Sequence, residues 1–302
     1  MRTHKIALYA APLLLLALAA CHRPSPARGR RAILDDIGRT VLVPPAPRRL
    51  ISLAPSSTEI LYAIGAGDRL VGIDRYSDWP KATASVAKVG ANLDPSLERI
   101  LGLRPDLVFI TTSANTEATD EGLAHAGIPV FVSRARKLSE IYADIEAIGG
   151  AVGREEAARA LTASMRARFE KLRARWAGRP PVRTLVVVWP DPLVVASRTS
   201  HLDDLITLAG GINVADDSTQ PFPTYSLERL LARAPEVILV GSHAAGAPAH
   251  GAFERLTAVP AVRDHRVYSI DGNLIFRPGP RVVEGAEAIA RLLHPDRAGA
   301  AK

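Results

Sequence analysis

Short apolar runs alternate with amphipathic stretches along most of this chain. The apolar runs predict buried strands at 49–53, 70–73, 106–110 and 129–132, and a second series at 184–188, 193–196, 236–240 and 267–270. Helices are predicted near 56–64, 116–126, 201–209 and 281–293, the first from a capping-box spacing, Ser56 to Glu59. Strands separated by helices are typical of parallel sheets covered on both faces.

One longer helix is predicted between the two series, from Arg154 to Trp176. Its apolar residues recur every three or four positions and form one stripe: Ala157, Leu161, Met165, Phe169, Leu172 and Trp176. Acidic residues open the segment and basic residues close it, as the helix dipole favours. At 1.5 Å per residue this helix is roughly 35 Å long, about the width of a small domain.

An internal repeat relates the two series. The segment Ser96 to Leu101 (SLERIL) recurs as Ser226 to Leu231 (SLERLL), and RPDLV at 104–108 aligns with APEVI at 234–238. The offset is 130 residues throughout, and each copy predicts a helix, a proline-marked turn and a buried strand. The predicted fold is therefore two Rossmann-like α/β lobes with central parallel sheets, joined by a single long helix.

Composition narrows the class of protein. The chain has 302 residues, of which 47% are hydrophobic and 23% charged, and it contains one cysteine. These values exclude a disordered chain and a disulfide scaffold. The formal charge of +7 comes from scattered arginines rather than from a basic run, which argues against nucleic-acid binding.

The N-terminus predicts export and lipidation. A short basic start is followed by fifteen apolar residues, Ile6 to Ala20, too few to span a bilayer comfortably but typical of a signal peptide. The run ends in Leu18-Ala19-Ala20-Cys21, which resembles the bacterial lipoprotein box. That resemblance implies a lipid on Cys21 and a membrane anchor. A soluble secreted protein is the alternative.

Catalytic motifs are missing from the sequence. It contains no Walker A sequence, no strand followed by GxGxxG, no HExxH and no GxSxG. His243 and His250 flank a loop of small residues, where solvated histidines are a simpler interpretation than a metal pair. His201 with Asp203 and Asp204 is best explained as a helix start. We therefore predict neither an enzyme nor a metal site.

Several motifs together resemble one known family. They are LAPSSTE at 53–59, YSDWP at 76–80, VG at 89–90 with PSLE at 95–98, PFPTYSLE at 221–228 and FRPGPR at 276–281. From Arg49 to Leu293 the chain resembles the periplasmic substrate-binding proteins whose lobes are joined by one rigid helix. These proteins serve importers of cobalamin, haem and ferric siderophores, and the resemblance is strongest to the cobalamin-binding members.

The resemblance implies roles for individual residues. It places ligand contacts on Tyr76, Phe222, Asn273, Phe276 and Arg277, and docking on the importer's permease on Glu98 and Glu228. Trp189 is a further ligand candidate because it lies in a stiff turn directly after a predicted strand, where such clefts form. Aromatic faces suit a large flat macrocycle, and Trp79 is a weaker candidate of the same kind. Asn92 stands where the cobalamin binders have another cleft tryptophan.

The expected organisation is a signal peptide at 1–20, a tether and lead-in at 21–45, lobes at 46–150 and 179–302, and a linking helix at 151–178. We expect a monomeric lipoprotein of the periplasm or cell envelope, with no cofactor of its own. It would capture cobalamin and deliver it to an ABC permease with its ATPase. Haem or a ferric siderophore is the alternative ligand, and an enzyme acting on a metallocofactor or small molecule held between the lobes is the alternative class.

Overall fold

The computed structural model describes residues 29–113, 117–242 and 253–295. Cys21 and the predicted signal peptide, as well as His243 and His250, lie outside the described residues. Within them, none of the helices combines the length and apolar character needed to cross a bilayer.

The first lobe is built on a four-stranded parallel sheet in the order β4-β3-β5-β6. Its strands are β3 (Leu50–Ser52), β4 (Leu70–Ile73), β5 (Leu107–Thr111) and β6 (Val130–Ser133). The helices are α1 (Pro55–Ala63), α2 (Leu97–Gly102), α3 (Glu117–His125) and α4 (Leu138–Val152), with short 3-10 turns at Gly67–Arg69 and Lys81–Ser85. β5 is buried at every position, as a central strand covered on both faces requires.

The second lobe repeats this plan. Its sheet has the order β11-β10-β7-β8, and β9 pairs with β7. The strands are β7 (Val182–Pro190), β8 (Leu193–Val195), β9 (Gly211–Asn213), β10 (Val237–Ser242) and β11 (Val267–Asp271). The helices are α6 (His201–Leu208), α7 (Leu227–Arg233), α8 (Pro260–Arg263), α9 (Gly272–Ile275) and α10 (Val282–Leu293). All pairings are parallel except β7 with β8, which form an antiparallel hairpin.

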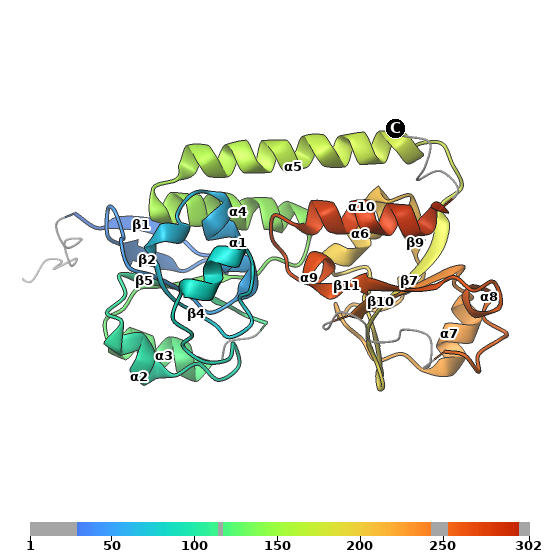
Figure 1. Cartoon of the computed structure of the whole chain (residues 1–302), viewed down its shortest axis with the longest axis horizontal. Helices are drawn as coiled ribbons and strands as arrows, with labels where there is room; N and C mark the ends of the chain where they lie inside the picture. The colour runs from blue at the N-terminus through green and yellow to red at the C-terminus, as the bar shows by residue number, and fades with distance from the viewer. Residues whose placement is uncertain (1–28, 114–116, 243–252, 296–302) are drawn as a thin grey trace, which may run out of the picture.

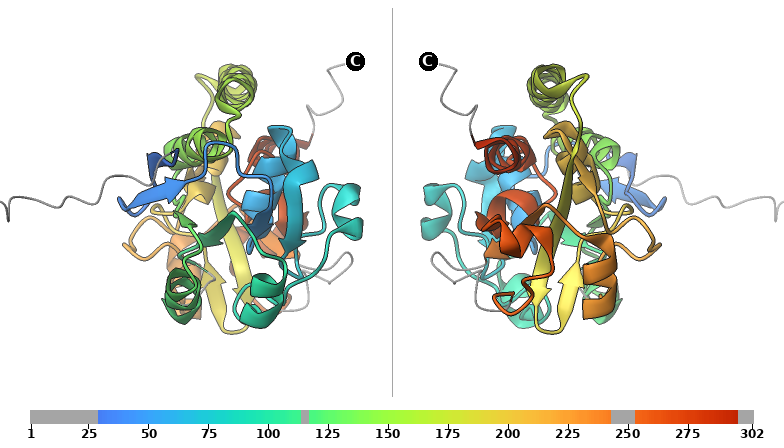
Figure 2. Two further views of the ribbon diagram at one scale, coloured as in Figure 1. Left: turned by 90° about the vertical axis from the view of Figure 1, so that its left-hand side faces the viewer. Right: turned by 90° about the vertical axis from the view of Figure 1, so that its right-hand side faces the viewer.

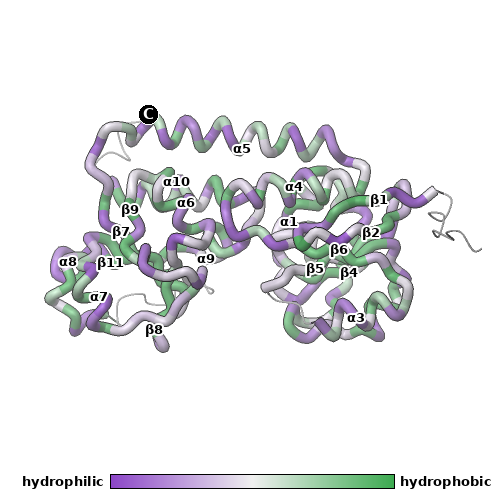
Figure 3. Tube along the Cα trace, turned by 180° about the vertical axis from the view of Figure 1, so that it is seen from behind, coloured by the Kyte–Doolittle hydropathy of each residue, from purple (hydrophilic) through white to green (hydrophobic). Residues whose placement is uncertain are grey.

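The predicted linking helix is present as α5 (Glu155–Trp176). It runs along one long side of the molecule, with α4 of the first lobe and α10 of the second beneath it (Figures 1 and 2). Met165, Phe169 and Trp176 from the predicted stripe are buried, and hydrophilic residues are interleaved along the rest of the helix (Figure 3). The buried side chains join one hydrophobic core that contains Phe109 of the first lobe and Leu239 of the second.

Three elements of the first lobe were not predicted. Strands β1 (Arg31–Leu34) and β2 (Thr40–Val43) form an antiparallel hairpin, whose Val41 and Val43 enter the shared core. Helix α4 packs against α5, and its buried apolar face, which includes Ile141, Ile145 and Ile148, enters the shared core. The hairpin and α4 therefore tie the beginning of the described chain to the linking helix.

The internal repeat appears as two identically capped helices. The Ser96 hydroxyl accepts a hydrogen bond from the Arg99 amide at 3.3 Å, and the Ser226 hydroxyl accepts one from the Arg229 amide at 3.3 Å. Helix α1 behaves differently from its prediction. It begins at Pro55 after Ala54, without a side-chain cap, so the predicted capping box at Ser56 to Glu59 is wrong.

Candidate ligand-binding site

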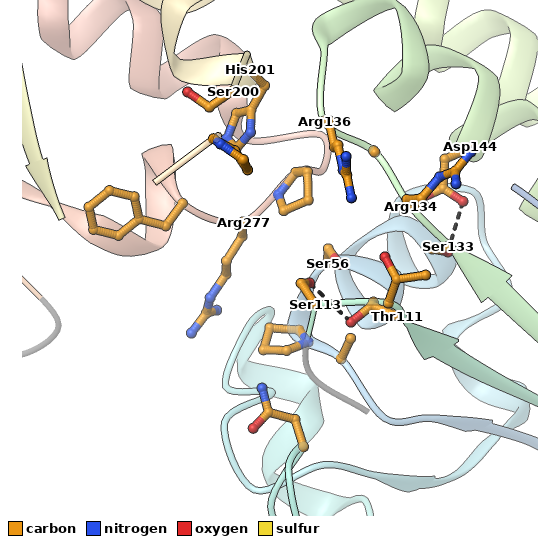
Figure 4. A pocket seen from close by; sticks show the side chains of 18 of the residues that line it. Ser56, Thr111, Ser113, Ser133, Arg134, Arg136, Asp144, Ser200, His201 and Arg277 are labelled. Carbon is orange, nitrogen blue, oxygen red and sulfur yellow. Dashed lines mark hydrogen bonds between the residues drawn. The ribbon is translucent and has the colours of Figure 1, made fainter. Parts of the chain in front are cut away.

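A cleft between the two lobes encloses a cavity of about 390 Å³. Its wall in the first lobe comes mainly from residues 54–56, 111–113 and 133–136, which lie at or just after the carboxyl ends of β3, β5 and β6. Its wall in the second lobe comes from residues 200–201, 221–222 and 276–278. Ligands of open parallel sheets bind beyond the carboxyl ends of the strands, and much of this wall lies there. Figure 4 shows the labelled side chains gathered from both lobes.

Three of the six predicted ligand residues line this cavity: Phe222, Phe276 and Arg277. The Phe276 ring lies against the end of β10, where a side chain at Gly241 would collide with it. Close approach of this kind requires glycine. Glycine at position 241 therefore leaves the space on β10 that the Phe276 ring occupies.

Tyr76, Trp189 and Asn273 lie outside the lining of the cavity. Tyr76 is on the loop after β4, and Trp189 is near the turn of the β7–β8 hairpin. Asn273 is half-buried and is the second residue of α9. The Trp189 indole N–H donates to the Asp191 carbonyl at 2.8 Å. This carbonyl orients the ring on the hairpin.

The exposed aromatic side chains of the described chain are the four that the sequence singled out. Tyr76, Trp79, Trp189 and Phe222 are exposed by 52%, 46%, 52% and 45%. Two lie on each lobe, and the β7–β8 hairpin that carries Trp189 extends to the side of the molecule opposite α5 (Figure 1). Large apolar side chains exposed beside a cleft are candidates for ligand contact.

A buried polar network holds the loop that carries Tyr76. The carboxylate of Asp74 accepts a hydrogen bond from the Tyr76 amide at 2.9 Å and another from the Ser77 hydroxyl. The Ser77 hydroxyl also lies 2.8 Å from that of Thr58 on α1. Burial raises the pKa of Asp74, while the hydrogen bonds oppose this shift. The loop is therefore fastened to α1 from inside the lobe.

Glu59 joins the two lobes. Its carboxylate belongs to α1 of the first lobe, and its side chain is only 3% exposed. It accepts hydrogen bonds from Arg277 Nη1 at 3.0 Å, from Arg281 Nε at 2.8 Å and from Arg281 Nη2 at 2.6 Å. Both arginines come from the loop between α9 and α10 of the second lobe. A buried carboxylate is stable when it is paired and hydrogen-bonded in this way.

Arg277 makes further contacts across the interface. Its Nη1 donates to Asp78 at 2.7 Å, and its Nη2 donates to the Tyr76 carbonyl at 3.2 Å. The guanidinium of Arg281 stacks over the Trp79 ring at 4.9 Å. Arg277 thus lines the cavity and at the same time ties the Tyr76 loop to the other lobe.

A second ionic contact joins the lobes through Lys137, the residue before α4. Its ammonium lies 3.2 Å from Asp203 and 3.6 Å from Asp204, both in the first turn of α6. The Leu138 amide donates to Asp204 at 2.8 Å. The acids next to His201 therefore belong to the interface between the lobes. His201 itself is buried, with Nε2 2.7 Å from the Ile275 carbonyl, and burial lowers its pKa.

The sequence analysis missed most of the polar lining: Ser56, Thr111, Thr112, Ser113, Ser133, Arg134, Arg136, Asp144 and Ser200. Burial, followed by the charge of Asp36, raises the pKa of Asp144 well above its ordinary value, although the Ser133 hydroxyl donates to Asp144 at 2.8 Å. Asn92 also lines the cavity, so the position where the resemblance implies tryptophan faces the ligand site. Among the described residues, no group of three or more His, Cys, Asp or Glu side chains is arranged to hold a metal ion.

Glu98 and Glu228 lie far from the cavity wall. Each is exposed in the first turn of its capped helix, α2 or α7. These two helices lie at the ends of the two lobes on the side opposite α5 (Figure 1). The pKa of Glu228 is lowered, mainly by a hydrogen bond with the Ser226 hydroxyl. The repeat therefore places one acidic side chain on the same side of each lobe.

Comparison with known proteins identifies the family. Residues 50–274 match the family model described as periplasmic binding protein. This chain belongs to that family. A vitamin B12-binding protein of Vibrio cholerae is 30% identical over 257 residues, which are 84% of this chain and 92% of the relative. An uncharacterised ABC transporter substrate-binding lipoprotein of Bacillus subtilis, YvrC, is 32% identical to this chain. The match covers 95% of this chain and 96% of YvrC.

Solved periplasmic binding proteins share the two-lobed architecture. The crystal structure of the vitamin B12-binding protein BtuF of Vibrio cholerae matches with a TM-score of 0.72 and 30% identity, covering 83% of this chain and 98% of BtuF. A periplasmic heme-binding protein from Pseudomonas aeruginosa matches with a TM-score of 0.74 and 26% identity, covering 82% and 93%. The predicted fold class is confirmed, and these relatives are binding proteins rather than enzymes.

Replacing Glu59 tests its role between the lobes. Glu59→Gln removes the charge that pairs with two guanidinium groups in a buried setting, so we expect the free energy of unfolding to fall by about 3 kcal/mol. Chemical denaturation measures this value. The control is Glu156→Gln on the exposed side of α5, for which a change within about 0.5 kcal/mol is expected. Equal stability of the two variants would show that the Glu59 pairs do not hold the lobes.

Proposed function

We propose that this chain is the substrate-binding protein of an ABC importer, and that it captures cobalamin between its lobes and delivers it to the membrane permease. One observation carries the proposal: two exposed aromatic rings on each lobe accompany a cleft whose wall includes several serine and threonine residues. A corrinoid is a broad, mostly flat macrocycle with amide arms. Its faces suit aromatic rings, and its arms suit the hydroxyl-rich wall.

The size of the cavity agrees with a ligand that protrudes from the cleft. A volume of about 390 Å³ lies within the range of small-molecule sites. A corrinoid is larger than this cavity, so part of it must extend past Phe222 toward the rim. We infer that Tyr76 and Trp189 cover this outer part, and that Asn273 contributes at the same edge. Phe222, Phe276 and Arg277 then contact the inner part.

Haem is the second candidate ligand. Asn92 lines the cavity at the position where the cobalamin binders have a tryptophan. Its amide cannot provide the apolar stacking contact that an aromatic ring would make with a corrinoid. The heme-binding protein of Pseudomonas aeruginosa shares the fold at 26% identity. A ferric siderophore is a third candidate, which Arg277 and Arg281 do not favour because both are engaged with Glu59.

Ligand titrations test the proposal. Visible spectra and calorimetry of the purified protein with cyanocobalamin, haemin and a ferric hydroxamate should give the tightest binding for cyanocobalamin. Phe222→Ala should weaken that binding by about 10-fold, because it removes one aromatic contact surface. Ile212→Ala, an exposed apolar truncation on β9 outside the cleft, is the control and should bind as the wild type does. Tight haemin binding without cobalamin binding would overturn the ligand, and no binding at all would overturn the function.

We further infer that Glu98 and Glu228 dock the loaded protein on its permease. The two acids occupy equivalent positions of the repeat and lie on the same side of the molecule (Figure 1). Exposed leucines follow each of them at the same spacing, Leu101 and Leu231. A pair of equivalent charged patches suits a pseudosymmetric or dimeric partner that carries the opposite charge.

Substitution of both acids tests this docking. Glu98→Gln with Glu228→Gln should weaken association with the solubilised permease by about 10- to 100-fold and should reduce its dependence on salt. Glu156→Gln on α5 is the matched control. Binding of the double variant at wild-type strength, measured by surface plasmon resonance, would refute the docking role.

The proposed location is the periplasm or the outer surface of the cell membrane, with the protein held there by a lipid on Cys21. The predicted signal peptide supports this proposal, as does the relative from Bacillus subtilis that is named a lipoprotein. Residues between Cys21 and β1 are rich in proline and arginine, a composition typical of a tether. Such a tether leaves the cleft free to meet both the ligand and the permease.

A further inference from the structure

The segment that leaves β6 places three cations within four residues: Arg134, Arg136 and Lys137. Lys137 is paired with Asp203 and Asp204 of the second lobe. The guanidinium groups of Arg134 and Arg136 form neither an ion pair nor a hydrogen bond with described residues, although the backbone amides of both are hydrogen-bonded. Both arginines line the cavity and are two residues apart on the segment that follows β6 (Figure 4). Two positive charges of the cleft thus lack an anionic partner.

The other charged groups of the cavity do not offset these two arginines. The charge of Arg277 is already balanced by Glu59 and Asp78. The carboxylate in the lining is Asp144, which is buried and shares its surroundings with Asp36. Because its pKa is raised well above the ordinary value, Asp144 holds its proton further toward neutral pH and supplies less negative charge.

We propose that Arg134 and Arg136 form a seat for an oxyanion of the transported ligand, a carboxylate or a phosphodiester. Guanidinium groups present paired N–H donors that match such oxyanions, and a partner of this kind would satisfy both side chains at once. This inference rests on the proposed function of the cleft. It also adds to it, because the seat would fix the orientation of the ligand.

The aromatic rings and the two arginines would contact different parts of a candidate ligand. Aromatic rings supply broad contact that tolerates rotation of a flat macrocycle, whereas a paired guanidinium contact is directional. A corrinoid carries one phosphodiester in its nucleotide loop, and haem carries two propionate carboxylates. Either group can meet Arg134 and Arg136 on the first-lobe wall while the macrocycle lies toward Phe222 and Phe276 on the opposite wall.

The first arm of the test probes the seat without a macrocycle. Inorganic pyrophosphate is titrated into full-length protein labelled at the arginine side chains with nitrogen-15. We expect two guanidinium resonances to shift, and we expect Arg134→Gln and Arg136→Gln to remove one each. Arg159→Gln, the same charge change on the exposed side of α5, should leave both shifts in place. Pyrophosphate shifts that persist in the double variant, or that never involve these two residues, would overturn the seat.

The second arm compares ligands with and without the anionic group. Cyanocobalamin is paired with cobinamide, which lacks the phosphodiester, and haemin is paired with its dimethyl ester. In the pair that binds, the member with the oxyanion should lose about 10-fold or more in affinity in the Arg134→Gln, Arg136→Gln double variant, and the member without it should be unaffected. Equal losses for both members, or no loss, would overturn the seat but leave the importer function standing. If none of the four ligands binds the wild type, the proposed function fails and the pyrophosphate arm alone decides the seat.

Discussion

A buried carboxylate that is shared by two guanidinium groups sets the relation between the lobes. Glu59 belongs to α1, which lies directly after the first strand of its sheet, whereas Arg277 and Arg281 lie more than two hundred residues later. Bringing these groups together out of water is unfavourable unless all three meet in good geometry. The lobes therefore have one strongly preferred spacing. Lys137 with Asp203 and Asp204 makes a second contact of the same kind, and the core that α5 shares with both lobes supports each of them.

This constraint explains why binding groups gather where they do. Strand ends from both sheets meet at the cleft, and the Glu59 contact holds them close enough to enclose one cavity. Arg277 takes part in the contact and in the lining, so the same side chain joins the lobes and borders the ligand. The loop that carries Tyr76 is tied to Arg277 through its backbone carbonyl. The exposed rings of Tyr76 and Trp79 are thus presented on a loop whose position depends on the contact between the lobes.

Local patterns predicted the architecture but not the contacts between distant segments. The four-residue apolar runs, the stripe of α5 and the repeat at a spacing of 130 residues each depend on neighbours in the sequence, and they placed the two sheets and the linking helix correctly. The apolar face of α4 carries an equally regular signal, which the sequence analysis did not use. The β1–β2 hairpin was missed because each of its strands is only four residues long, too short to give a clear alternation of apolar and polar positions.

The candidate site was predicted only in part, because many of its contacts join segments that are distant in the sequence. Phe222, Phe276 and Arg277 were found through family motifs, and the structure places all three on the cavity wall. Glu59 was misassigned because its spacing from Ser56 fits a helix cap, whereas its true partners lie in the other lobe. Arg134 and Arg136 resemble ordinary surface residues, and only the fold shows that they border a cavity.

The distance between the lobes in solution tests the central claim most directly. Spin labels are attached to cysteines introduced at Ala118 on α3 and Ala232 on α7, both exposed, with Cys21 replaced by serine. Pulsed electron paramagnetic resonance should give one narrow distance distribution that moves by less than about 2 Å when ligand binds, and Glu59→Gln should broaden it. Two populations in the unliganded wild type, separated by more than about 2 Å, would contradict the account.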